Sequence, residues 1–207
     1  MVPRPMPVST SRQQARTEAT RRKLLKSAEQ IFARNGFEAA RIEDIAAAAG
    51  YTRGAFYANF KSKEDLFMAL LEDFVGRRVA DVRDLMAQAE SPRAQATALR
   101  EYYARVATQR QWALIFMEYK LFAIRHSQAR ARLQRRIRGL RAAGIEILRN
   151  LSAALGRKLP VSATAAAVGM GALSNALLLE QLVDPESISG ENVHTLLTLF
   201  FDLITGE

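Results

Sequence analysis

The stretch GAFYANFKSKEDLF, residues 54–67, decides the fold class of this chain because its aromatic residues recur at helical spacing. Phe56 and Phe60 lie four residues apart and share one side of a helix, whereas Tyr57 shares the neighbouring side with Arg53. We expect the two phenylalanines to enter a small core and Tyr57 to face solvent with its hydroxyl free. The segment therefore predicts a short helix with one buried and one polar face.

The polar face of this helix carries little bulk. Gly54 and Ala55 leave the surface beside the polar side chains open, so the helix can approach another large surface closely. A DNA major groove is about as wide as a helix. The short helical segment IEDIAAAAG, residues 42–50, and the link GYT, residues 50–52, complete a helix-turn-helix unit. The spacing alone also fits an ordinary solvated helix.

Outside this unit the chain is predicted to be helical as well, because apolar residues recur at helical spacing and no segment alternates with period two. About nine helices are expected, with Gly36 as a left-handed stop after the first. They cover residues 17–35 and 42–50, a third helix capped by Thr52, a fourth capped by Ser62, and residues 91–107, 111–126, 128–155, 162–183 and 189–205.

The composition of the 207 residues favours a polyanionic partner, since 30 lysines and arginines against 21 acids give a formal charge of +9. Two basic segments stand out: the N-terminal residues 1–26, whose first 16 residues are predicted to form a disordered arm, and residues 125–141. The second is more typical of a solvated helix face. The chain has no cysteine, which excludes disulfides and cysteine-ligated metals. No metal or cofactor is expected, and a signal peptide and membrane span are lacking, so we expect a cytoplasmic protein without a membrane partner.

Residues 20–74 resemble the DNA-binding domain of the TetR family of bacterial transcriptional regulators. The motif comprises an alanine and a phenylalanine late in the first helix, Gly36 followed by an aromatic residue, Ile45-Ala46, Ala49-Gly50, Gly54, Tyr57, Phe60, Lys63 and Leu66. The resemblance implies an all-α homodimer on double-stranded DNA, with two third helices in successive major grooves. It implies a DNA-binding domain at residues 17–63 and an effector-binding and dimerisation domain at residues 64–207.

Carried over residue by residue, the resemblance places Arg53, Gly54 and Ala55 nearest the base edges. It assigns phosphate contacts to Tyr57, Asn59 and Lys63. Arginine can contact guanine in a bidentate way, and a phenol can donate to a phosphate oxygen. Two positions depart from the family pattern: Arg41 stands where helix two usually opens with serine or threonine, and Asn59 replaces a frequent histidine. The predicted DNA-binding residues are Arg41, Thr52, Arg53, Gly54, Ala55, Tyr57, Asn59, Lys61 and Lys63.

The resemblance also implies an effector cavity and a dimer interface in the larger domain. An apolar or aromatic effector is expected, although core packing is the alternative for each aromatic residue. The candidate cavity residues are Tyr103, Trp112, Phe116, Met117, Glu118 and Asn175. The small and aliphatic residues that can pair across a two-fold axis are Ala165, Gly169, Ala172, Ala176, Leu179, Leu196, Leu199 and Phe200.

These observations favour a ligand-responsive, sequence-specific DNA-binding regulator, more often a repressor than an activator. An architectural or nonspecific DNA-binding dimer without effector control is the alternative, and steep salt dependence without sequence preference distinguishes it. An enzyme is not expected, because the chain has no Gly-rich phosphate loop, and its two histidines, His126 and His194, are isolated from any acid–base cluster.

Overall fold

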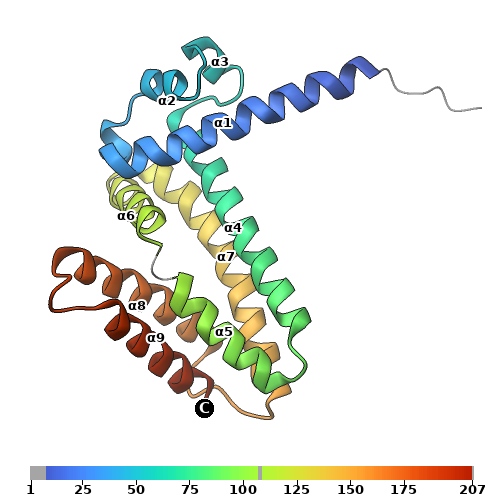
Figure 1. The fold of residues 1–207 in the computed structure, drawn as a ribbon, viewed down its shortest axis with the longest axis vertical. Helices are drawn as coiled ribbons and strands as arrows, with labels where there is room; N and C mark the ends of the chain where they lie inside the picture. Colours follow the sequence, from blue (N-terminus) through green and yellow to red (C-terminus); the bar gives the residue numbers. More distant parts are fainter. Residues whose placement is uncertain (1–7, 107–108, 207) are drawn as a thin grey trace, which may run out of the picture. The chain divides into compact units, whose positions relative to one another are not determined.

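The computed structural model describes residues 8–106 and 109–206, which contain nine helices and no strand. The predicted all-α fold is confirmed. In chain order, and as Figure 1 labels them, the helices are α1 (Val8–Ala39), α2 (Ile42–Ala48), α3 (Arg53–Tyr57), α4 (Lys63–Gln88), α5 (Pro92–Val106), α6 (Arg110–Arg125), α7 (Ser127–Ala154), α8 (Ala163–Val183) and α9 (Gly190–Thr205).

Five of these helices begin at a hydroxyl residue, as their sequences predict. In each case the side-chain oxygen accepts a hydrogen bond of 3.1–3.3 Å from the backbone N–H three residues further on, which satisfies one unpaired donor of the first turn. The capping residues are Thr52, Ser62, Ser91, Ser162 and Ser189. Their positions fix where α3, α4, α5, α8 and α9 start.

The first helix differs from its prediction at both ends. It begins at Val8, so residues 8–16 are helical rather than disordered, and the remaining arm residues 1–7 lie outside the described part. Arginine, glutamine and alanine are good helix formers, which explains the extension. At the other end, Gly36 interrupts the helix with φ 76° and ψ 166°. Its φ is positive as expected, but its ψ is extended, so it forms a kink rather than a left-handed cap.

The chain divides into two compact units, and the first holds the helix-turn-helix. It comprises the residues up to Asp73 together with Leu114–Phe122 of α6. Its centre is a group of aromatic rings in mutual contact: Phe32, Phe37, Phe67, Tyr119 and Phe122. The start of α4 thus belongs to this unit, and the predicted domain boundary between residues 63 and 64 falls inside it.

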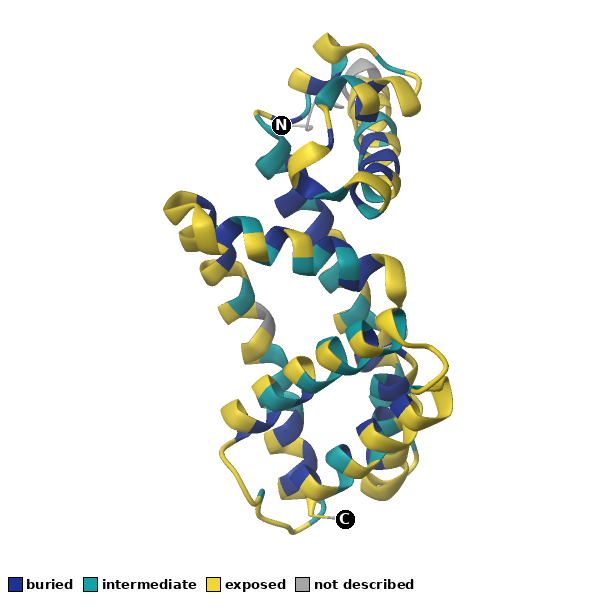
Figure 2. Ribbon diagram, turned by 90° about the vertical axis from the view of Figure 1, so that its left-hand side faces the viewer, coloured by how far each residue is buried: buried dark blue, intermediate teal, exposed yellow. Residues whose placement is uncertain are grey.

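The second unit consists of Phe74–Ala113 and the residues from Ala123 onward. In both units buried residues alternate with exposed ones along the helices (Figure 2). The core of the second unit is built by α4, α5, α7, α8 and α9, with Leu99, Val193 and Phe201 almost fully buried. Arg100 on α5 pairs with Asp202 on α9 at 3.2 Å, which ties these two helices together.

Helix α8 is unusually apolar for a helix with so much exposed surface. By length and composition it is the one described helix that could cross a membrane, yet only 17% of its most apolar 18-residue window is buried. One such helix is weak evidence for a membrane protein. Its neighbour α9 also exposes leucines, which are Leu196, Leu199 and Leu203. The second unit therefore presents an uncovered apolar face on its last two helices.

Candidate nucleic-acid interface and effector region

The aromatic residues of α3 divide between core and surface as their spacing predicts. Phe56 is fully buried and Phe60 is 4% exposed, and their ring centroids lie 5.8 Å apart. Ile45 and Ala46 of α2 are buried in the same unit. Tyr57 is 45% exposed. The buried phenylalanines hold α3 against the unit, so the opposite side of this short helix remains open for a ligand surface.

The exposed side of α3 is built around Arg53. Its Nη1 lies 3.0 Å from Oε1 of Glu43 on α2, and its guanidinium lies 5.5 Å from the centre of the Tyr57 ring. A hydrogen bond with the Tyr57 side chain and the charge of Glu43 raise the pKa of Arg53. The side chain is therefore oriented within the unit by contacts that solvent can readily exchange.

Arg41 precedes α2 without capping it, as its sequence predicts. Its side chain makes no cap hydrogen bond to the described first turn, and its Nε lies 3.8 Å from Glu43. Glu43 thus lies between two exposed guanidinium groups, Arg41 and Arg53. Of the other predicted contact residues, Thr52, Gly54 and Lys61 are exposed and Ala55 is half-buried.

Lys63 has a structural role that its sequence position did not suggest. Its Nζ donates hydrogen bonds to the carbonyl oxygens of Glu38, at 2.8 Å, and Ala40, at 2.9 Å. It also lies 4.8 Å from the centre of the Phe37 ring. Burial lowers the pKa of Lys63. The lysine joins the end of α1 to the start of α4, and the phosphate contact stays a prediction.

Asn59 is also engaged within the unit. Its side-chain nitrogen donates to the Ala55 carbonyl at 2.8 Å, and its own carbonyl accepts a hydrogen bond from Nη1 of Arg21 at 2.9 Å. Arg21, on α1, lies 4.3 Å from the centre of the Phe60 ring. From the sequence, Arg21 was interpreted only as part of a basic segment. In the structure its hydrogen bond to the Asn59 carbonyl links α1 to the residues that follow α3.

The predicted cavity residues fall into both units. Phe116, Met117 and Glu118 belong to the first unit and Tyr103, Trp112 and Asn175 to the second. Glu118 is exposed, and its carboxylate lies so close to Gly36 that a Cβ on that glycine would be 3.0 Å from Oε2. The structure thus gives Glu118 a place beside the α1 kink, and its role as an effector anchor stays a prediction.

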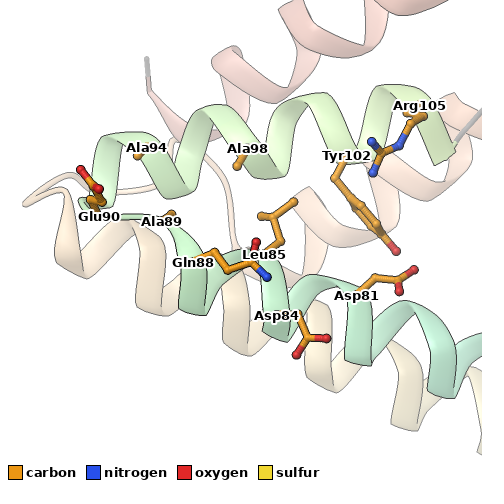
Figure 3. Close-up of a pocket in the computed structure, with 10 residues that line it drawn as sticks. All are labelled: Asp81, Asp84, Leu85, Gln88, Ala89, Glu90, Ala94, Ala98, Tyr102 and Arg105. Atoms are coloured by element: carbon orange, nitrogen blue, oxygen red, sulfur yellow. The ribbon is translucent and has the colours of Figure 1, made fainter.

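An open groove of about 810 Å³ lies between α4 and α5 in the second unit. Figure 3 shows Ala94, Ala98 and Tyr102 of α5 on one side and Leu85 and Asp81 of α4 on the other. Its described lining includes none of the six predicted cavity residues. Three carboxylates and one arginine give it an acidic character; they are Asp81, Asp84, Glu90 and Arg105.

A second feature of this unit is a row of aromatic and cationic contacts near Arg78 of α4. The Phe74 ring stacks on Trp112 with 3.7 Å between centroids, and the Arg78 guanidinium lies 4.2 Å from the Phe74 centroid. The hydroxyl of Tyr102 donates to the Arg78 carbonyl at 3.4 Å. Sequence reasoning found Trp112 by its aromatic character but had no signal for Arg78.

Residues 24–70 match the family model described as "Bacterial regulatory proteins, tetR family". This part of the chain, with its capped α3 and the buried aromatic residues behind it, is thus similar to the matched region of bacterial regulators of the TetR family. Among curated proteins, the transcriptional repressor BepR of Brucella suis is 36% identical over 78 residues, which cover 38% of this chain and 35% of that protein. Matched segments of the curated relatives span 22–40% of their length.

Solved structures resemble the chain over almost its whole length. A putative TetR-family regulator from Rhodococcus sp. superposes with a TM-score of 0.74 at 22% identity, covering 91% of this chain and 99% of that one. The regulator FadR from Bacillus subtilis in complex with stearoyl-CoA gives a TM-score of 0.70 at 16% identity, covering 90% and 98%. At these identities the likeness concerns the fold.

Proposed function

We propose that this chain is a ligand-responsive transcriptional regulator that binds a palindromic operator as a homodimer. The observation that carries the proposal is the exposed pair Arg53 and Tyr57. Both lie on α3, which Thr52 caps and buried aromatic residues support, within residues that match the TetR family model. A helix of this kind can place its side chains at base edges in a major groove. Repression rather than activation is proposed because a relative such as BepR is a repressor.

In this proposal Arg53 reads a base pair and Tyr57 binds a phosphate. Breaking the exposed ion pair with Glu43 costs little, so the guanidinium is available for a bidentate contact with guanine. Arg41, Thr52 and Lys61 add contacts to the DNA backbone. Gly54 and Ala55 let α3 approach the groove closely, while Asn59 and Lys63 act from partly internal positions.

The homodimer is proposed from the uncovered apolar face of α8 and α9. Leu199 is 60% exposed and Leu203 is 67% exposed, which is unfavourable for a monomer in water. Ala165, Ala172 and Ala176 add small exposed residues that permit close approach. Gly169 serves the contact within the chain instead, since a Cβ there would be 2.9 Å from the Phe200 ring. Leu179, Leu196 and Phe200 complete the proposed interface.

The experiment that tests the proposal is selection from a random duplex library with the full chain at about 150 mM salt, where nonspecific binding is reduced. A pseudo-palindrome with half-sites about one helical turn apart is expected for the dimer. Recovery of DNA without a motif overturns sequence-specific regulation. A monomeric mass in light scattering at micromolar concentration would separately overturn the dimer.

A nonspecific DNA-binding dimer is the second candidate, and the exposed arginines of α7 favour it. Arg130, Arg135, Arg138 and Arg141 are all exposed on this helix. Such a basic face contributes to binding of any polyanion. Affinity that falls steeply with salt but is equal for selected and scrambled duplexes would support this candidate over the regulator. In either case the site of action is the bacterial cytoplasm.

A further inference from the structure

We propose that the effector of this regulator is an amphipathic anion, a carboxylate on an apolar body, and that Arg78 of α4 is the residue that binds its carboxylate. The inference rests on the proposed function, since it names the ligand class to which the regulator responds. It adds a negative charge to the apolar or aromatic effector expected from the sequence.

The guanidinium of Arg78 forms no ion pair with the described residues, and Asp81 acts on it only through its nearby charge. Its Nη2 donates to the neutral side-chain oxygen of Gln109 at 3.1 Å, and its plane faces the Phe74 ring. Its Nε is withdrawn from solvent and has no hydrogen-bond acceptor within the described part of the chain. One strong donor of a cationic group is therefore unsatisfied.

Arg100, in the same unit, shows what an arginine with countercharges looks like here. Its Nη1 lies 3.3 Å and 3.2 Å from the two carboxylate oxygens of Asp202. Its Nε, like that of Arg78, has no hydrogen-bond acceptor within the described part of the chain, but it lies 3.5 Å from a carboxylate oxygen of Glu101. Both arginines are half-buried. Arg100 belongs to α5, and Arg78 belongs to α4, where its carbonyl accepts a hydrogen bond from Tyr102 of α5. Arg100 thus forms ion pairs with two carboxylates, whereas Arg78 contacts a side-chain amide and an aromatic ring.

An unpaired charge withdrawn from water is unfavourable and is uncommon unless it has a use. Burial lowers the pKa of Arg78 to about 10, so the group still carries its charge at neutral pH. Deprotonation of Arg78 therefore does not remove the unfavourable free energy of burying its charge at neutral pH. A carboxylate that enters from solution would supply the missing ion-pair partner and accept a hydrogen bond from Nε–H.

The donors of Arg78 suit a carboxylate in particular. Nε–H and Nη2–H are adjacent on one edge of the guanidinium, which matches the two oxygens of a carboxylate in bidentate geometry. Asp81 lies close enough to influence the titration of Arg78, which disfavours a doubly charged ligand such as a phosphate monoester. The single positive charge and the nearby acid together select a monoanion.

The surroundings of Arg78 suit an apolar body on that monoanion. Phe74 and Trp112 are stacked beside the guanidinium, and burial raises the pKa of the half-buried Tyr103 nearby. Aromatic faces bind acyl chains and aromatic rings well but gain little from small hydrophilic anions. An acyl or aryl carboxylate is thus the ligand class that meets both the charge and the rings.

Binding at Arg78 would also act on α6. The second carboxylate oxygen competes for Nη2, which holds Gln109, the residue directly before α6. Residues Leu114–Phe122 of that helix belong to the unit that carries α3, and α4 likewise begins there. An occupant at Arg78 therefore alters the start of a helix that continues into the DNA-binding unit, which gives it a route to change operator affinity.

The test is a titration of the full protein followed by fluorescence, because Trp112 is the only tryptophan in the sequence and stacks beside the site. The probes are acetate, hexanoate, decanoate, benzoate and 4-phenylbutyrate, each with its neutral carboxamide, and phenyl phosphate as the dianionic arm. We expect the acyl and aryl carboxylates to bind and their carboxamides to bind about ten- to a hundredfold more weakly.

The variants are Arg78→Gln and, as a matched control, Arg77→Gln, which removes the same charge from the exposed neighbouring position. Carboxylate binding should fall about ten- to a hundredfold in Arg78→Gln and stay unchanged in Arg77→Gln. Arg78→Lys keeps the charge but lacks the paired donors, so it should bind about tenfold more weakly than wild type and serves if the glutamine variant does not fold.

Three results would overturn the inference: equal affinity for acid and amide, full binding by Arg78→Gln, or no carboxylate binding below about 10 mM. Tighter binding of phenyl phosphate than of benzoate would overturn the monoanion class. Operator binding is measured in parallel without probe. A protein that binds its operator but no carboxylate refutes only this inference, whereas carboxylate binding without operator binding refutes only the proposed function.

Discussion

Arg53 in the first unit is exposed and has an ion-pair partner, whereas Arg78 in the second unit is half-buried and has none within the described part of the chain. Exposure alone would suggest the reverse. The exposed Arg53 has a carboxylate partner at 3.0 Å, although water could solvate it equally well. The withdrawn Arg78, which needs a partner more, has an amide and an aromatic ring. An exposed ion pair such as that of Arg53 can therefore give way to a new partner at little cost. A charge that is withdrawn from water without an ion-pair partner, such as that of Arg78, gains one only when an anion binds.

The largest expected effect is on operator binding through the α3 surface. Arg53→Ala should weaken binding to the selected operator about 5- to 150-fold and relax preference at one base pair, because a bidentate contact is lost. Tyr57→Ala should weaken binding to all sequences alike. Fluorescence anisotropy with operator and scrambled duplexes measures both. Undiminished binding by both variants would show that α3 is not the reader.

The next prediction concerns stability and separates the two half-buried arginines of the second unit. Arg100→Met should lower the free energy of unfolding by about 1–3 kcal/mol, because it leaves Asp202 without its partner. Arg78→Met should raise it by about 1 kcal/mol, because it removes an uncompensated charge and keeps the packing against Phe74. Urea unfolding measures both, and an equal loss in the two variants would contradict the difference drawn here.

Lys63 tests whether a cation in the DNA-binding unit serves structure or DNA. Lys63→Met should lower the free energy of unfolding by about 1–2 kcal/mol, since the carbonyls of Glu38 and Ala40 lose their donor. The control is Lys61→Met at an exposed position, which should change stability by less than about 0.5 kcal/mol. Thermal unfolding of the two variants measures both changes. An equal loss of stability in the two variants would refute the structural role of Lys63.

The smallest effect is expected at Glu43, the partner of Arg53. Glu43→Gln removes a negative charge that faces the DNA-binding surface and competes with phosphates for two arginines. Operator affinity should rise about two- to fivefold and stability should change by less than about 0.5 kcal/mol. A loss of operator affinity would instead mean that Glu43 is needed to orient Arg53, which the anisotropy assay would show.

The helices and the faces of α3 could be predicted from the sequence because their causes are local. Thr52 caps α3 through a bond to Ala55 three residues away, and Phe56 and Tyr57 diverge because of the helical repeat. Lys63 could not be predicted in the same way. The carbonyls that it binds belong to residues 38 and 40, and only the folded unit brings these groups together.

The effector region was the part least accessible from the sequence. Aromatic residues such as Trp112 stand out in any sequence, but they cannot be divided into core and cavity without coordinates. Arg78 directly follows Arg77 in a helix, and such a pair predicts two solvent-exposed charged side chains. What distinguishes them is that Nε of Arg78 is closed off from water, and this depends on how α4 packs within its unit.

If the proposed homodimer covers the leucines exposed on α9, the cellular amount of this protein becomes a variable of its regulation. If Leu196, Leu199 and Leu203 are covered only when two copies meet, the fraction of paired chains falls on dilution. Below the dissociation constant of the pair, operator occupancy then rises with the square of protein concentration. A twofold change in gene dosage would shift occupancy about fourfold in that regime, so synthesis rate and effector level would act on the same promoter as two separate inputs.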